Sequence, residues 1–246
     1  MKVFKADLHI HTVLSPCGSL DMSPGAIVKA ALRKKLDIIG ITDHNSTRQC
    51  RIVWSEAEKA GLTVYPGAEV TTKEEVHCLA FFENFEKLDE FQLFLDANLP
   101  DIKNDSELFG YQVVVNEQEE IVYEEEKLLI SAIDKSIDQV EKEVHRLKGL
   151  FIPAHVNRSK YSLISQLGFV PPDLKFDALE LTKHQDTASF LKSWPYLKEA
   201  SIIRSSDAHQ PEIIGEAYTQ LLMADKSFNE FALALGNTGG REVIRQ

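Results

Sequence analysis

Apolar residues at the start of the chain change repeatedly between the spacing of a strand and that of a helix. Residues 2–8 alternate as a strand does, and residues 23–35 open on Ser-Pro, which supplies an N-cap and a first helical residue. Apolar runs at residues 37–42 and 63–71 predict two buried strands, and the segment between them has the apolar stripe of an amphipathic helix. The predicted order is therefore strand, helix, strand, helix, strand.

The same alternation continues towards the C-terminus. Residues 76–82 predict another strand followed by a helix, and apolar residues at helical spacing between Ile133 and Leu147 predict a helix that ends before Gly149. Four later strands are predicted at residues 150–154, 178–182, 202–206 and 218–223. A last helix follows Ser227, and the glycine-rich end after it is expected to be loose.

Residues 102–131 interrupt the alternation of strands and helices. Two strand-like segments, at residues 111–115 and 121–125, flank the polar residues 116–120, and this pattern predicts a β-hairpin. We expect the hairpin to be an insertion between two units of the main fold, where it would serve as a lid or subdomain.

Strands and helices in alternation are typical of an α/β protein with a parallel sheet. The number of strand–helix units is sufficient for the sheet to close into a barrel of about seven or eight strands. A length of 246 residues is usual for such a barrel, so residues 1–246 are expected to form one domain. Functional side chains in these barrels lie at the carboxyl ends of the strands.

Composition narrows the classes of partner. Hydrophobic residues make up 43% and charged residues 26% of the chain, as in a globular protein with a sizeable core. The 38 acidic residues outnumber the 27 Lys and Arg residues, and the net charge of −11 opposes general binding to nucleic acid or to an anionic membrane. With three cysteines, no secretory signal pattern and no apolar stretch of membrane-spanning length, a cytoplasmic protein with a small polar substrate is expected.

Histidines and acidic residues gather at the predicted strand ends. His9 and His11 follow the first strand, and residues two apart in an extended segment point to the same side, so both imidazoles can reach one ion. The other candidates at or near strand ends are Asp43, His44, Glu69, His77, His155, Asp207 and His209. Such nitrogen and carboxylate donors suit zinc, manganese or iron, and a carboxylate such as Glu69 can bridge two ions.

Some of these residues have an equally ordinary interpretation. A single histidine at a strand end is more often a satisfied polar group than a ligand, and His77 lies inside an apolar run that would also suit a buried core histidine. His145 lies on a predicted helix and is expected to be structural, whereas His184 ends a strand and could contact substrate. Asp7 and Asp43 are candidates for accepting the second N–H of ligating histidines.

Several motifs in the right order resemble those of the PHP superfamily, named for polymerase and histidinol phosphatase. They are DLHIHT from Asp7, TDHN from Thr42, PGAE ending at Glu69, SDAH from Ser206, and the isolated His77 and His155. The resemblance covers nearly the whole chain and implies a distorted (β/α)₇ barrel that holds two or three divalent metal ions at the carboxyl ends of its strands. It assigns the ions as follows: His9, His11, Glu69 and Asp207 to the first, Glu69, His77 and His155 to the second, His44 and His209 to the third.

Cys17 stands where many members of that superfamily have a histidine or aspartate ligand of the third ion. A thiolate is a good zinc ligand, and the turn-like Ser-Pro-Cys-Gly sequence could present Cys17 to the ion. An ordinary loop cysteine is the alternative, and the sequence does not separate the two.

Metal ions of this kind can lower the pKa of a bound water and supply hydroxide for attack on a phosphoryl group. Phosphate also needs fixed positive charge, which Arg158 could supply by a bidentate pair, although a surface arginine would look the same. Asp43 and His209 are candidate proton donors to the leaving group. The leading hypothesis is a phosphoesterase acting on a nucleotide, sugar or histidinol phosphate. Hydrolysis of a non-phosphate bond and a non-catalytic, metal-binding accessory or sensor role are the alternatives.

Overall fold

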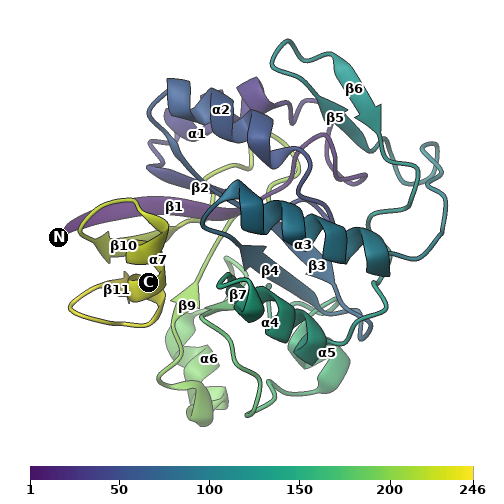
Figure 1. Cartoon of the computed structure of the whole chain (residues 1–246). Coiled ribbons are helices and arrows are strands. Elements are labelled where there is room, and N and C mark those ends of the chain that lie inside the picture. The colour runs from purple at the N-terminus through teal and green to yellow at the C-terminus, as the bar shows by residue number, and fades with distance from the viewer. Residues whose placement is uncertain (246) are drawn as a thin grey trace.

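A curled, seven-stranded sheet forms the centre of the fold, with helices packed outside it (Figure 1). The computed structural model describes residues 1–245, so Gln246, the last residue of the predicted domain, lies outside the described residues. The strands of this sheet, in spatial order, are β11 (Glu242–Ile244), β10 (Thr219–Met223), β1 (Lys2–Ile10), β2 (Ile38–Ile41), β3 (Thr63–Thr71), β4 (His77–Phe81) and β7 (Leu150–Pro153). Two shorter strands, β8 (Leu179–Glu180) and β9 (Ile202–Ile203), pair with each other. The α/β class predicted from the sequence is confirmed.

The helices are α1 (Pro24–Arg33), α2 (Cys50–Lys59), α3 (Phe85–Asn98), α4 (Ile137–Arg146), α5 (Leu163–Leu167), α6 (Thr187–Ser193), the short 3₁₀ turn η1 (Pro195–Leu197) and α7 (Phe228–Leu235). Helices α1, α2, α3, α4 and α7 lie in the predicted helical segments, whereas α5, α6 and η1 were not predicted. Ser23 caps α1 by accepting a hydrogen bond from the Ala26 amide, and Ser136 forms a capping box with Gln139 at the start of α4. Local sequence therefore sets where these helices begin.

The sheet is mixed, whereas the sequence predicted a parallel one. β1, β2 and β3 run parallel, but β4 is antiparallel to both β3 and β7. The reason is the connection between β3 and β4, residues 72–76, which is too short for the crossover of a dozen or more residues that a parallel pair needs. Consequently the start of β4 lies beside the end of β3, and His77 pairs with Thr71.

The C-terminal end is another correction. Residues 242–244 are not loose, because β11 forms an antiparallel ladder with β10, with Val243 opposite Leu221. The turn before β11 contains Gly239 and Gly240, both at positive φ, a conformation that glycine adopts without steric cost.

The region 102–131 contains a hairpin of β5 (Val113–Val115) and β6 (Ile121–Glu124), which projects to one side of the molecule (Figure 1). β5 is buried and β6 is exposed. The Gln49 side chain joins the hairpin to the start of α2 through the amide and carbonyl of Val115. The end of this region reaches the strand ends, because Asn45 donates to the carbonyls of Leu129 and Ser131.

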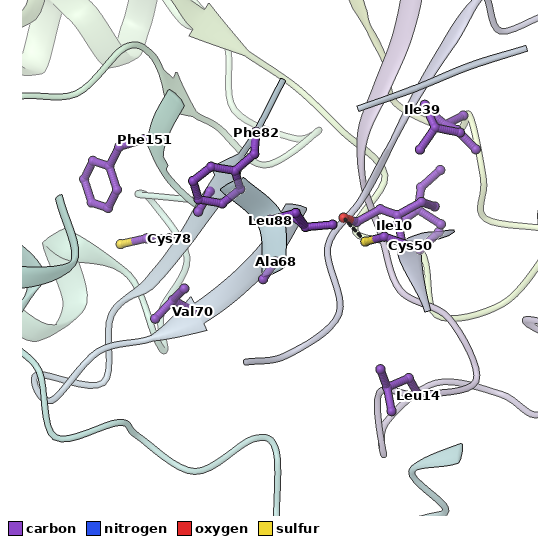
Figure 2. Packing of buried hydrophobic residues seen from close by; sticks show 14 of the residues in the cluster. Ile10, Leu14, Ile39, Cys50, Ala68, Val70, Cys78, Phe82, Leu88 and Phe151 are labelled. Atoms are coloured by element: carbon purple, nitrogen blue, oxygen red, sulfur yellow. Dashed lines mark hydrogen bonds between the residues drawn. The ribbon is translucent and has the colours of Figure 1, made fainter. Parts of the chain in front are cut away.

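Two apolar layers hold the strands in place. Between sheet and helices, Figure 2 shows Ala68 and Val70 of β3 with Cys78 of β4, Phe82 and Phe151, all fully buried. Within the curl of the sheet, a second cluster joins side chains of β1, β4 and β7 to Phe231 of α7. Because both faces of the sheet are buried, close packing fixes which side chains project at the end of each strand. Within residues 1–245, none of the helices combines the length and the apolar character needed to cross a membrane.

Candidate metal centre

Glu69, near the end of β3, lies at the middle of a group of imidazoles. Its carboxylate is 1% exposed, and nitrogen atoms of five histidines lie 2.9–3.3 Å from it. His9, His77 and His155 face Oε1, and His11 and His44 face Oε2. These histidines come from the ends of β1, β2 and β7 and from the start of β4, so only the folded sheet brings them together.

Asp207 and His209 close the other side of this group. Asp207 Oδ1 lies 3.4 Å from the Nε2 atoms of both His9 and His11, and the His209 ring stacks on His11 with 4.1 Å between centroids. The buried carboxylate of Asp7 holds their loop, because it accepts hydrogen bonds from the amides of Ser206 and Gly215.

The backbone is strained at two of these positions. His155 has a φ of 30° and Asp207 a φ of 52°, both in the left-handed region that non-glycine residues seldom adopt. Such conformations concentrate at functional sites, where the surrounding structure holds them in place.

Three sets of side chains have donor atoms that all lie within 4.8 Å of one another: His9, His11 and Glu69; His44, Glu69 and His77; and His11, His44 and His209. The first and third sets contain residues that the resemblance assigned to the first and third ions. The second set has His44 where the resemblance placed His155, although His155 Nε2 lies 3.2 Å from Glu69.

The chemistry of these donors fits a metal ion. The Nε2 atoms of His9 and His11 are 3.2 Å apart, and at most one of them can donate to the other, so their shared space suits a cation. Nδ1 of His44 is buried and lies 3.1 Å from Oε2 of Glu69 without the geometry of a hydrogen bond, and Nδ1 of His155 is buried and makes no hydrogen bond within residues 1–245. A buried nitrogen without a hydrogen bond is costly unless a ligand satisfies it, and imidazole and carboxylate donors suit zinc, manganese or iron.

The electrostatics keep several of these groups in the form that binds metal. Burial lowers the pKa of His44 well below its ordinary value and that of His209 to about 4, so both imidazoles are neutral near pH 7. Burial opposes ionisation of Glu69, but the neighbouring His77 and His9 hold the pKa of Glu69 well below its ordinary value. Against the effect of burial, Glu69 and Glu180 raise the pKa of His9, and Asp207 and Glu69 raise the pKa of His11 to about 9. Neutral imidazole and ionised carboxylate are the states that ligation requires, so metal binding at His9 and His11 displaces protons.

Asp43 does not face the open part of the site. Its carboxylate accepts hydrogen bonds from the Thr12 amide at 2.7 Å, the Thr12 hydroxyl at 2.8 Å and the Ser15 hydroxyl at 2.7 Å. Ser15 Oγ is in turn 2.9 Å from Nδ1 of His11. These contacts connect Asp43 to His11 through Ser15, which is the arrangement expected of a residue that supports a ligating histidine. The role of proton donor stays a prediction.

Glu180 is a site residue that the sequence analysis missed. Its Oε2 accepts a hydrogen bond from Nδ1 of His9 at 3.1 Å and another from the His155 amide at 3.0 Å. Glu180 lies in β8 and is 2% exposed. An acidic residue within the apolar segment 178–182 was the one signal in the sequence that could have identified it.

Two adjoining cavities lie over the cluster. One, of about 240 Å³, is lined by Cys17, Ile130, Tyr161 and the cluster residues His44, Glu69, His77, Asp207 and His209. The other, of about 310 Å³, is lined by Glu180, Lys183 and His184 among others. Arg158 and Asp207 line both cavities, and Arg158 Nη1 lies 3.0 Å from Asp207 Oδ2. Arg158 and His184 are therefore beside the centre. Cys17 lines the cavity of about 240 Å³ but belongs to none of the three donor sets.

Comparison with known proteins assigns the sequence to a family. The family model of the PHP domain matches residues 7–166. YqxK of Bacillus subtilis strain 168, an uncharacterized protein, is 27% identical across 99% of the chain, which spans 65% of the length of YqxK.

Solved structures share the fold at lower identity. The lesion-specific endonuclease PfuEndoQ from Pyrococcus furiosus superimposes with a TM-score of 0.74 and 21% identity over 98% of this chain and 58% of its own. A protein from Bifidobacterium adolescentis, named as a candidate metal-dependent phosphoesterase, gives a TM-score of 0.62 and 18% identity, with 95% of this chain and 96% of its own covered. At these identities the likeness concerns the fold.

Proposed function

The chain belongs to the PHP-domain family, and on this basis we propose that it is a metal-dependent hydrolase of phosphate esters. The observation that carries the proposal is the convergence of five imidazoles on the buried carboxylate of Glu69. A centre this rich in imidazole nitrogen and carboxylate donors suits two or three divalent ions of zinc, manganese or iron. When bound, such ions supply a hydroxide nucleophile and stabilise the charge that develops on a phosphoryl group.

The residues around the cavities would bind the metal ions and the substrate. His9, His11, His44, Glu69, His77, His155, Asp207 and His209 would hold the ions. Arg158, 47% exposed at the boundary of the two cavities, can turn from Asp207 to pair with phosphate oxygens. His209 serves better as a ligand than as a proton donor, because a pKa of about 4 leaves little of it protonated near pH 7.

Small phosphorylated metabolites are the preferred substrate class. The two adjoining cavities, of about 240 and 310 Å³, together have the size of a small-molecule site, and the net charge of −11 disfavours a long polyanion without a dedicated basic surface. His184, which lines the larger cavity, would contact the organic part of such a substrate.

The test is hydrolysis by protein loaded with manganese or zinc. Phosphate release is measured on nucleotide, sugar and histidinol phosphates, and product formation is measured on a phosphodiester, a DNA duplex and a panel of amides. Activity should appear on phosphomonoesters and disappear in His9→Ala. His145→Ala is the matched control, because His145 lies outside the cluster, and it should retain activity. Cleavage of DNA alone would exclude the metabolite class, and hydrolysis of amides alone would point to a non-phosphate bond. Full metal loading without any hydrolysis would favour the accessory or sensor role.

A further inference from the structure

Tyr161 is held in an unusual way beside the metal centre. It lies in the loop between β7 and α5 and has a φ of 57°, in the left-handed region. A bulky aromatic residue is disfavoured in that region, so the surrounding contacts must hold it there. Tyr161 belongs to none of the sequence motifs described above.

The contacts that hold Tyr161 lead directly to His77. The Tyr161 carbonyl accepts a hydrogen bond from the His77 amide at 3.0 Å. The two rings are nearly parallel, with an interplanar angle of 12° and 4.9 Å between centroids. Tyr161 nevertheless remains 42% exposed and lines the cavity of about 240 Å³ above the cluster. One face of the ring is covered by His77, while the ring as a whole stays accessible from the cavity.

The cavity of about 240 Å³ has a polar floor and a less polar wall that contains Tyr161. The floor consists of the imidazoles and carboxylates of the cluster, whereas Tyr161 and Ile130 contribute a phenol ring and an aliphatic side chain. Ile130 comes from the end of the region 102–131, which Asn45 ties to the strand ends through Leu129 and Ser131. Two segments remote in sequence thus supply an apolar surface next to a polar centre.

We propose that Tyr161 and Ile130 bind a flat, apolar ring in the organic part of the substrate. The inference rests on the proposed phosphate-ester function and specifies its substrate class: esters that carry an aromatic or heteroaromatic ring close to the phosphate. The phosphoryl group lies on the floor of the cavity and the ring lies against the phenol of Tyr161. Parallel or edge contacts between aromatic rings favour such a substrate over an aliphatic one of similar charge.

Binding of two phosphonates to metal-loaded protein tests this without requiring turnover. Phenylphosphonate and methylphosphonate carry the same anionic group and differ in the ring, and calorimetry gives the affinity of each. Wild-type protein should bind phenylphosphonate about fivefold more tightly, a preference of the size expected for an aromatic pair. Tyr161→Asn should reduce the ratio to about one and Tyr161→Phe should keep it. Asn is chosen because it tolerates the left-handed backbone.

Tyr111→Asn is the matched control, because Tyr111 is 50% exposed and lies outside the cavity lining, and it should keep the wild-type ratio. The ratio also separates binding from positioning, because a disturbed His77 would weaken both phosphonates together. Equal affinities in the wild type, or an unchanged ratio in Tyr161→Asn, would overturn the inference and leave the proposed function standing. Failure of both phosphonates to bind metal-loaded protein would overturn the proposed function, and this inference with it.

Discussion

Glu180 accepts a hydrogen bond from His9 across 171 residues of sequence, with 3.1 Å between Oε2 and Nδ1. Both side chains are buried, so the contact fixes the ring of His9 with Nδ1 towards Glu180 and Nε2 towards Glu69 and Asp207. The same oxygen accepts from the His155 amide, so one carboxylate positions residues at the ends of two strands.

Loss of this contact should weaken metal binding. Glu180→Ala is expected to lower the affinity for the first ion by about 10- to 100-fold, the usual effect of removing a group that orients a ligating histidine. Titration of apoprotein with zinc measures it. Glu216→Ala, which removes an exposed partner of Lys183, is the control and should bind zinc as the wild type does. Equal affinities in Glu180→Ala and wild type would show that His9 needs no orienting carboxylate.

Arg158 should matter for substrate and not for metal. Arg158→Ala is expected to reduce kcat/KM about 10- to 100-fold, because a charge-assisted pair with phosphate is lost, while the metal content stays at the wild-type level. Steady-state kinetics on the best phosphomonoester, together with elemental analysis, checks both. Arg33→Ala, at the exposed end of α1, should have no effect. Unaltered kinetics in Arg158→Ala would remove Arg158 from the site.

Cys17 should be dispensable for the third ion. His11, His44 and His209 form a donor set without it, although Cys17 lines the same cavity. Cys17→Ser is therefore expected to keep the full metal content, and His209→Ala to lose one ion per chain. Elemental analysis of the two variants decides the question. A loss of zinc in Cys17→Ser would instead establish thiolate ligation.

His145 should make stability depend on pH. Its Nδ1 lies 2.6 Å from Glu141 and its Nε2 lies 3.1 Å from Asp177. The hydrogen bond to Asp177 has the larger effect and that to Glu141 the smaller, and together they raise the pKa of His145 although burial lowers it. A histidine with a raised pKa in the folded state stabilises the protein fully below its unfolded pKa of about 6.5, and this contribution disappears as pH rises through the folded pKa.

The expected contribution of His145 is about 1 kcal/mol, since its side chain is 31% exposed. Urea unfolding of apoprotein at pH 6 and pH 9 measures it, with His145→Gln compared at both values. The variant should be less stable than the wild type at pH 6 and closer to it at pH 9. The same deficit at both pH values would mean that the charge of His145 contributes nothing.

The sequence by itself determined most of the candidate residues and the positions of the long strands and helices. His9, His11, Glu69 and Asp207 were identifiable because strand and helix periods are local properties, and strand ends can be located from them. The capping serines Ser23 and Ser227 are local signals of the same kind.

Tertiary structure decided the rest. The direction of β4 depends on the short connection before it and on pairing with β3 and β7, and β11 forms only because β10 offers an edge. Glu180 and Tyr161 have no motif of their own, and their roles arise from contacts with His9 and His77, each on a different strand. Periodicity records how each side chain is directed relative to its own backbone, whereas these contacts depend on distances between segments that only the packed sheet brings together.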